Sequence, residues 1–444
     1  MKKLLIAACF LCRGAYAQPL TANFENDIQS AVYALSHVMI HDVINPPAAA
    51  RYYAYCLMGT YEIVSQNDPS IIPLSSVLNG YHLNYVGVDK GKYNYRLASL
   101  YCILETGKRL LPSGYMLEKQ EGDLLKICKK AKITPAVIGQ SVTVAKAMTE
   151  TIVAYSKTDN YNKLSARLGY TPKKGEPYWD PTPPDYAEAV EPNWKTIHTL
   201  IIDSAGEFKP LPLTPFSKDS SSAFYKLAKE VYDISRKAVP EYEAIANFWD
   251  NNPFAVQTEG HMMIGFKKIS PGGHWMNIAG IAAKRARLSF NQSVQVYTML
   301  SVTMMDAFIS AWEEKYRSNR IRPVTYINRY IDVRWVPLLQ TPPFPEYISA
   351  HSIVSTSAAE ILTFFLGDGF SYTDDTEVSS GATPRRFSSF RNAAEEACIS
   401  RLYGGIHFRD AIVNGQKTGK EVGKLAIQKM KAAGMRPFIA EQKN

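Results

Sequence analysis

Cationic, hydroxyl and imidazole side chains recur along the last third of the sequence in an order that suits a tetrahedral oxyanion. In chain order the set is Lys315, Arg322, Ser349, His351, Arg401 and His407. An oxyanion that carries several negative charges can be buried only beside cationic forks and hydroxyl or amide donors. A simple anion site needs no histidines, whereas an imidazole nitrogen can bond a central atom or move a proton. The set therefore predicts a catalytic pocket.

The first two cations belong to one segment. Lys315 closes a long predicted helix, and Arg322 follows seven residues later. Pro323 disfavours helical backbone at Arg322, so we expect the helix to end there and the guanidinium to project from a turn. Arg317 and Arg320 fall on other faces of this segment and are interpreted as a solvated basic patch.

Ser349 and His351 stand at the start of a second predicted helix, which runs to about Phe365. Serine is a common N-cap, and a helix N-terminus offers free backbone N–H groups and a partial positive charge to an oxyanion. Taken alone, Ser349 could simply cap the helix and His351 could be a surface histidine.

Arg401 ends a third predicted helix, which a Gly-Gly pair breaks, and His407 is expected in the first turn of the next helix, from residue 406 to about 432. Asp410 lies three residues after His407 and could reach its imidazole. Such a contact would fix the tautomer and leave the other nitrogen free as a ligand or nucleophile. We therefore count Asp410 with the catalytic candidates, although a lone histidine here would more often be structural.

Helical periodicity dominates the remaining sequence, and alternating strand patterns are scarce. Amphipathic helices are predicted at 24–43, 48–65, 92–111, 135–155, 221–235 and 292–317. Proline clusters within 170–192 and 210–215 exclude continuous helix there, and such a segment either connects domains or covers a site. The sequence predicts an all-α fold with an N-terminal helical region over 18–220 and a C-terminal helical domain over 221–444.

The amino terminus matches a secretory signal. It has a basic start, an apolar run over 4–12 and the sequence AYA before Gln18, so we expect cleavage after Ala17 and export to the periplasm or the medium. A membrane anchor fits less well because the run is about half the length that spans a bilayer. A lipoprotein signal at Cys9 or Cys12 also fits poorly. No other segment approaches a membrane span, and none is expected in the mature chain.

The composition is that of an ordinary globular protein. The 444 residues are 46% hydrophobic and carry a formal net charge of +9, enough chain for a sizeable core. The positive excess suits an anionic substrate but equally describes a generic basic surface. Runs of lysine and arginine with interleaved aromatic residues, which would indicate nucleic-acid binding, do not occur. We expect a small-molecule substrate and no nucleic-acid partner; the sequence leaves the oligomeric state open.

Four cysteines and one further histidine carry chemistry outside the main set. The cysteines beyond the signal are Cys56, Cys102, Cys128 and Cys398. They contain no CxxC pair, and three disulfide pairings are possible after export. Cys56 and Cys102 lie in predicted helices and are more simply buried hydrophobes. His274 follows a Pro-Gly-Gly turn and is interpreted as a structural loop histidine, although the turn could bring it toward the pocket.

The segments KYRSNRIRP, ISAHS and SRLYGGIH resemble the three signature motifs of the vanadium-dependent haloperoxidase and type 2 phosphatidic acid phosphatase superfamily, within a region of about residues 290–435. In the second motif Ile348 replaces the usual proline and Ala350 the usual glycine, which slightly alters the backbone approach to the anion. In the third motif Ala411 occupies the position of the usual aspartate. The resemblance implies a helical-bundle core of the acid phosphatase and vanadium haloperoxidase type.

The resemblance also implies roles for the site residues. The anion would be bound by Lys315, Arg322, Ser349, the backbone amide of Ala350, and Arg401. His351 would be the acid–base residue. His407 would bond the vanadium of vanadate or, in a phosphatase, attack phosphorus to form a phosphohistidine.

The predicted pocket is compatible with three alternative functions. The first is a secreted haloperoxidase with a vanadate cofactor, hydrogen peroxide and a halide; the second is a secreted phosphatase that hydrolyses phosphomonoesters without a cofactor. The third is a non-catalytic phosphate-binding protein. The long helical N-terminal half favours the first, because a phosphatase core needs only the last third of the chain. The lack of a tryptophan before Arg322 leaves halide specificity unsupported, and the two histidines argue against the third.

Overall fold

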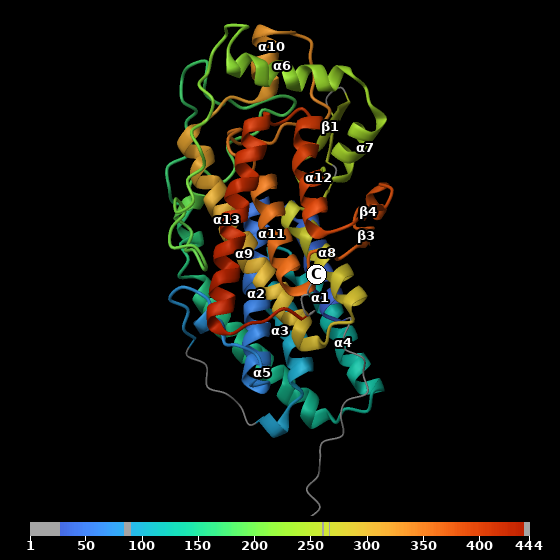
Figure 1. Ribbon diagram of the computed structural model, residues 1–444. Coiled ribbons are helices and arrows are strands. Elements are labelled where there is room, and N and C mark those ends of the chain that lie inside the picture. Colours follow the sequence, from blue (N-terminus) through green and yellow to red (C-terminus); the bar gives the residue numbers. More distant parts are fainter. Residues whose placement is uncertain (1–26, 84–89, 260–261, 266, 439–444) are drawn as a thin grey trace, which may run out of the picture.

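Helices dominate the protein (Figure 1) in the computed structural model, which describes residues 27–83, 90–259, 262–265 and 267–438. The helices are α1 (Asp27–His41), α2 (Pro46–Asn67), α3 (Tyr95–Leu110), α4 (Glu118–Lys130), α5 (Pro135–Ser156), α6 (Ala223–Arg236), α7 (Pro240–Phe248), α8 (Pro271–Ala286), α9 (Phe290–Ser318), α10 (Pro323–Tyr330), α11 (Ala350–Leu366), α12 (Phe390–Tyr403) and α13 (Arg409–Ala433). Two antiparallel hairpins pair β1 (Val256–Glu259) with β2 (Met262–Gly265) and β3 (Tyr372–Asp374) with β4 (Arg385–Phe387). The all-α prediction is confirmed.

Capping residues fix the ends of the long helices close to the predicted positions. The Asn45 side chain accepts a hydrogen bond from the Ala48 amide at 2.9 Å and so starts α2. Ser289 and Gln292 form a reciprocal capping box at the start of α9, which satisfies two backbone donors. Asn319, in left-handed backbone with φ 52°, ends α9 four residues after Lys315. These local signals explain why periodicity located the helices well.

The long helices lie side by side along the long axis of the molecule (Figure 1). α2 packs against α9 and α3, while α11 packs against α9, α12 and α13. Among the described residues α9 alone is long and apolar enough to cross a membrane, and its apolar stretch is fully buried inside the protein. One hydrophobic core includes residues from α1 to α13. The predicted domain boundary at 220/221 falls in the coil just before α6.

Glycines on α13 let it approach α11 closely. A Cβ added at Gly419 would lie 2.3 Å from the carbonyl oxygen of Ile353, and one at Gly415 would lie 2.8 Å from that of Ser349. Side chains at these positions would push the helices apart. The close contact continues to the helix ends, where the Ser349 amide donates to the Ala411 carbonyl at 3.3 Å. The starts of α11 and α13 are thereby held together.

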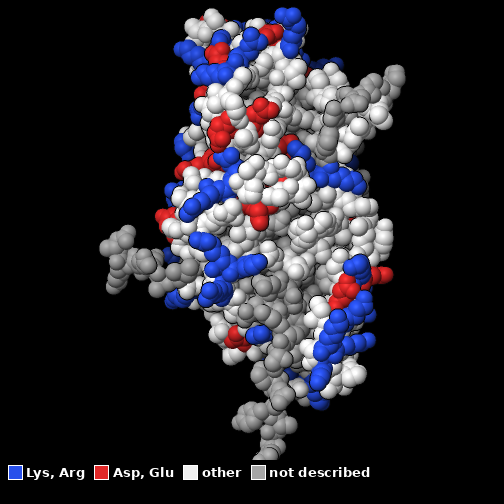
Figure 2. All heavy atoms as spheres, turned by 90° about the vertical axis from the view of Figure 1, so that its right-hand side faces the viewer, with Lys and Arg blue, Asp and Glu red and all other residues white. Residues whose placement is uncertain are grey.

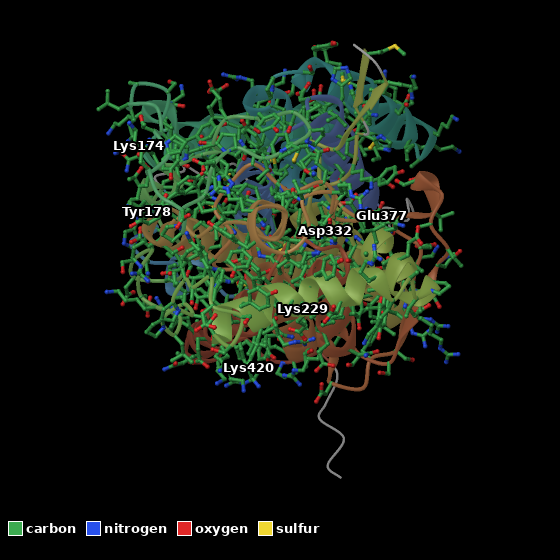
Figure 3. The ribbon with its side chains drawn as sticks, turned by 90° about the horizontal axis from the view of Figure 1, so that it is seen from above. Lys174, Tyr178, Lys229, Asp332, Glu377 and Lys420 are labelled. Atoms are coloured by element: carbon green, nitrogen blue, oxygen red, sulfur yellow. The ribbon has the colours of Figure 1, made fainter. Side chains whose placement is uncertain are left out.

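Helices α6 and α10 cover the end of the bundle where α13 starts. The ring of Phe224 in α6 contacts those of Phe408 and Tyr326, with centroids 5.2 and 5.0 Å apart. Figure 3 looks onto this end and shows Lys229 on α6 and Asp332 just after α10. The Tyr232 hydroxyl donates to the Asp332 carboxylate at 3.2 Å. This cover buries Phe408, the residue directly before α13.

The proline-rich segment 170–192 contains no helix, as predicted. It lies against the turn after α9: the Trp179 amide donates to the Asn319 carbonyl at 2.8 Å, and the Ile321 amide donates to Pro177 at 2.9 Å. Residues of this segment line a surface cavity of about 780 Å³. That cavity shares no lining residue with the site described below. The two hydrogen bonds show instead that the segment supports the turn between α9 and α10, which carries Arg320 and Arg322.

Charged side chains of both signs share the surface. On the face drawn in Figure 2, basic residues are interspersed with acidic ones and separated by uncharged areas. All four cysteines beyond the predicted signal are buried. Cys56, Cys102 and Cys398 are not joined in disulfides within the described part of the chain, which for Cys56 and Cys102 agrees with their interpretation as buried hydrophobes.

Candidate active site

A small, partly open cavity of about 50 Å³ lies at the α6–α10 end of the bundle. Four of the site residues predicted from the sequence line it, namely Ala350, His351, Arg401 and His407. Other lining residues are Pro46, Asp250, Asn251, Asn252, Pro253, Phe254, Pro271, Phe308, Trp312, Gln340, Pro342, Phe344 and Ile406. The volume accommodates a small anion and a few waters. Segments far apart in the sequence therefore meet at one small site.

Lys315 and Arg322 are held beside this cavity by backbone carbonyl groups. The Lys315 ammonium donates to the carbonyls of Pro345 and Glu346 at 3.0 and 3.2 Å. Arg322 donates from Nε to the Phe344 carbonyl at 2.9 Å. The Phe344 ring lies 4.9 Å from the Lys315 Nζ and 5.1 Å from the Arg322 guanidinium carbon. Arg322 Nη2 is buried and has no hydrogen-bond partner among the described residues, so it is available to an oxyanion.

The N-terminus of α11 faces the same cavity. Ser349 is the N-cap, and its hydroxyl accepts from the Ser352 amide at 3.3 Å and from the Ser352 hydroxyl at 2.8 Å. Ala350 and His351 form the first turn and line the cavity. The ring of His351 lies edge-on to Trp249, with centroids 6.4 Å apart. The partial positive charge of the helix end adds to that of the nearby cations.

Arg401 and His407 flank the Gly-Gly break after α12. Arg401 lies in the last turn of α12 and donates from Nε to the Ser400 hydroxyl at 2.9 Å and from Nη2 to the Trp249 carbonyl. The prediction that His407 starts the next helix is wrong: Phe408 is the extended N-cap, and α13 begins at Arg409. His407 therefore lies in the turn before α13, where its ring can enter the cavity.

Two hydrogen bonds define the tautomer of His407. Its Nδ1 lies 2.8 Å from Glu346 Oε1, and a carboxylate oxygen can only accept, so Nδ1 carries the proton. Arg322 Nη1 lies 3.3 Å from Nε2 and can only donate, so Nε2 is the acceptor. Both bonds favour the same neutral tautomer. His407 thus has an unprotonated Nε2 among the cations, as a ligand or a nucleophile requires.

The prediction that Asp410 orients His407 is wrong. The Asp410 carboxylate accepts two hydrogen bonds from Arg320, at 2.7 and 2.8 Å, and one from the Thr214 hydroxyl at 2.9 Å. Because His407 precedes α13, the helical i+3 relation that would have joined it to Asp410 does not exist. Arg320 is buried, so its interpretation as part of a solvated patch is also wrong.

Glu346 is the residue that the sequence analysis missed. Its Oε1 accepts from His407 and from the Phe408 amide at 3.0 Å, and its Oε2 accepts from Arg320 Nε at 2.5 Å. Asp410 therefore acts on His407 only through Arg320 and Glu346. One signal was present: Glu346 is the single charged residue in an apolar, proline-rich stretch directly before the ISAHS motif.

Burial lowers the pKa values of the basic groups around the cavity. It lowers the pKa of Arg322 and of Arg401 to about 10, and burial with Arg322 nearby lowers the pKa of Lys315 well below its usual value. Burial, followed by neighbouring cations, lowers the pKa of His407 and His351 well below the ordinary range. Both imidazoles are therefore neutral near pH 7, and they add no positive charge to that of the neighbouring lysine and arginine side chains.

Comparisons with known proteins identify the family of this chain. A sequence profile of the VCPO second helical-bundle domain matches residues 295–434, which include every site residue from Lys315 to Asp410. The solved structure of a bacterial vanadium-dependent iodoperoxidase is 40% identical in sequence, with 91% of this chain and 96% of that chain covered and a TM-score of 0.86. The chain belongs to the vanadium-dependent haloperoxidase superfamily. Its motif resemblance is thereby confirmed.

More distant structures share the haloperoxidase fold. A holo-type bacterial vanadium-dependent chloroperoxidase is 16% identical, with 88% of this chain and 93% of that chain covered and a TM-score of 0.61. An apo-type structure is 15% identical, with 88% and 96% covered and a TM-score of 0.64. No curated protein sequence matches the chain significantly. The relatives are vanadium-dependent enzymes, which implies an enzyme and a vanadate cofactor.

The pocket of this haloperoxidase homologue fits vanadate chemically. The buried Arg322 Nη2 lacks an acceptor within the described ranges, and the pKa of Lys315 is depressed by burial and by Arg322. An oxyanion supplies both an acceptor and negative charge. The unprotonated Nε2 of His407 is the kind of nitrogen that binds a metal centre. The donor set therefore suits vanadate, and it suits phosphate by the same charge and shape.

His274 forms a buried ion pair behind the cavity. The Pro-Gly-Gly sequence before it is the first turn of α8, so the prediction of a loop histidine is wrong. His274 Nε2 lies 2.9 Å from Asp374 Oδ2 and its Nδ1 lies 3.4 Å from Glu377 Oε1. Its ring stacks on Trp249, with centroids 4.6 Å apart and planes at 19°. The pair thus joins the β3 hairpin to the wall of the active site.

We expect the free energy of unfolding to decrease as pH rises from about 6.5 to 9. Burial opposes the charge on His274, but Asp374 and Glu377 outweigh it and raise its pKa from 6.5 to about 9. A group whose pKa is higher in the folded state stabilises the fold fully at pH values below its unfolded pKa. This stabilisation is lost as the pH rises through the folded pKa. The change is about 3 kcal/mol at most. Urea unfolding at several pH values measures it, and His274→Gln should remove this slope; an unchanged slope contradicts the assignment.

Proposed function

We propose that this protein is a vanadate-dependent haloperoxidase that oxidises a halide with hydrogen peroxide. In this reaction the halide loses two electrons, the O–O bond breaks, an oxygen–halogen bond forms, and one proton is consumed to give hypohalous acid and water. Iodide is the first halide to test, because the relative that is 40% identical is an iodoperoxidase. The observation that carries the proposal is the unprotonated Nε2 of His407 among buried cations.

Several residues would bind the oxyanion together. Vanadate would be held by Lys315, Arg322, Arg401, the Ser349 hydroxyl and the backbone amide of Ala350. When bound, vanadate supplies a Lewis acid that activates peroxide without changing its own oxidation state. Charge-assisted hydrogen bonds in a buried site are strong, and the carbonyl contacts of Lys315 and Arg322 hold these cations in place before the anion arrives.

The two histidines have different tasks. His407 would hold the vanadium through its unprotonated Nε2, while Glu346 keeps the proton on Nδ1. His351 would hold or move a proton at the cavity. Burial and then neighbouring cations lower its pKa, and the negative charge of a bound anion would offset the effect of the cations. Asp410 is a positioning residue, since it reaches His407 only through Arg320 and Glu346.

Export is part of the proposal. The basic start, the apolar run and the predicted cleavage after Ala17 all lie outside the described residues, so export and the cleavage position stay predictions. A secreted or periplasmic enzyme would meet peroxide and halide outside the cytoplasm.

Purified protein loaded with vanadate is expected to oxidise iodide or bromide with peroxide. His407→Ala should lower kcat at least roughly 1,000-fold, because it removes the vanadium ligand. The exposed His198 gives a matched control, and His198→Ala should retain activity. Phosphomonoester hydrolysis that vanadate inhibits, without halide oxidation, would support the phosphatase instead. Anion binding without either activity would support the phosphate-binding protein.

A further inference from the structure

Asn252, a residue that lines the cavity, has an unused hydrogen-bond donor. Its side-chain Oδ1 accepts from the Phe254 amide at 3.1 Å. A backbone N–H can only donate, so this contact fixes which end of the side-chain amide is oxygen. The other end, Nδ2, is buried and has no partner in the part of the chain that the structure describes. Asn252 also lines the cavity that His407 and Arg401 line.

The neighbouring Asn251 is turned the opposite way. Its Nδ2 donates to Glu377 at 3.0 Å, so its unpartnered buried atom is the oxygen Oδ1. An oxygen acceptor repels an anion, whereas the N–H groups of Asn252 attract one. Of these two neighbouring asparagines, Asn252 is therefore the one whose unpartnered atom can donate to an anion.

The surroundings of Asn252 suit a weakly hydrated monovalent anion. The rings of Phe308, Trp312 and Phe344 line the same cavity, and an aromatic edge carries partial positive charge. Asp250 also lines the cavity, but Lys268 pairs with its carboxylate at 2.5 Å. A vanadate or phosphate ion carries more charge and requires the guanidinium forks. A halide carries a single negative charge, so one neutral amide donor with apolar walls is sufficient to bind it.

We propose that the side-chain amide of Asn252 binds the halide substrate, so that the cavity has a cationic oxyanion subsite and a neutral halide subsite. This inference rests on the proposed haloperoxidase function. Asn252 would set the halide KM without holding the cofactor. Peroxide, which has its own donors and acceptors, would depend little on Asn252.

Two variants test the side-chain donor of Asn252 separately from its structural contact with Phe254. Asn252→Leu removes the amide, and Asn252→Asp keeps the acceptor for the Phe254 amide but carries no donor. Both should raise the halide KM by roughly 10-fold or more, while the peroxide KM stays within about twofold. Vanadate affinity, measured by equilibrium dialysis, should be unchanged in Asn252→Leu. The exposed Asn247 on α7 provides the control Asn247→Leu, which should leave all three values unchanged.

Bromide soaked into crystals of the full chain gives a readout that needs no turnover. An anomalous peak in contact with Asn252 Nδ2, absent in Asn252→Leu, is expected. A peak only at the guanidinium groups would overturn the proposal, as would an unchanged halide KM or a loss of vanadate affinity in Asn252→Leu. If the wild type oxidises no halide, the proposed function fails, and the bromide map still decides whether Asn252 binds the ion.

Discussion

Glu346→Gln is expected to lower kcat for halide oxidation by roughly 100-fold or more. Glu346 accepts from His407 and Phe408 on one oxygen and from Arg320 on the other. A glutamine has one oxygen and one NH₂ group, so it must turn a donor toward either Arg320 or His407. Either choice loosens the tautomer that leaves Nε2 unprotonated. Steady-state kinetics with saturating vanadate measure the loss.

A graded series distinguishes this role from a purely structural one. Asp410→Asn should have a smaller effect in the same direction, because Asp410 acts through Arg320 and Glu346. Nitrogen NMR shifts of the His407 ring report the tautomer directly and should change in Glu346→Gln. Full activity with an unchanged ring spectrum in Glu346→Gln would rule out the positioning role.

Lys315→Met is expected to weaken vanadate binding by roughly 100-fold or more. The substitution keeps a similar length but removes a buried charge that lies beside Arg322. Vanadate binding should therefore raise the melting temperature of the wild type and barely change that of the variant, since ligand stabilisation follows affinity. Without vanadate we expect similar melting temperatures, because lost carbonyl contacts and relieved charge repulsion oppose each other.

Thermal unfolding with and without vanadate measures the Lys315 prediction. Lys420, labelled in Figure 3, is exposed on α13, so Lys420→Met is the matched control and should behave as the wild type. A full vanadate-induced shift in Lys315→Met would mean that Lys315 contributes nothing to the anion site.

The sequence predicted the helices and the cationic set because both depend on local patterns. Caps such as Asn45 and the capping box of α9 lie within a few residues of the helices that they start. The partners of His407 depend on tertiary contacts instead. Glu346 is separated from His407 by 61 residues, and Arg320 from Asp410 by 90 residues. Such contacts have no periodicity to reveal them.

His274 and Asn252 show the same limit for different reasons. The Pro-Gly-Gly before His274 resembled a turn, yet proline also suits the first turn of a helix, and α8 begins there. Asn252 stood in an unremarkable loop sequence, and only the hydrogen bond to Phe254 shows which end of its amide remains without a partner. A sequence shows which hydrogen-bond donors are present, but not which of them already have an acceptor in the folded protein.

The contacts under Lys315 and Arg322 bear on how the site tells anions apart. Both cations rest on carbonyl oxygens and on the face of Phe344, and the nearby carboxylate of Glu346 is already paired with Arg320. Carbonyl dipoles and a ring face hold the two cations in position without forming an ion pair with either. Attraction of an anion to such cations grows with the valence of the anion. We therefore expect this site to favour a multiply charged oxyanion over a monovalent anion such as chloride.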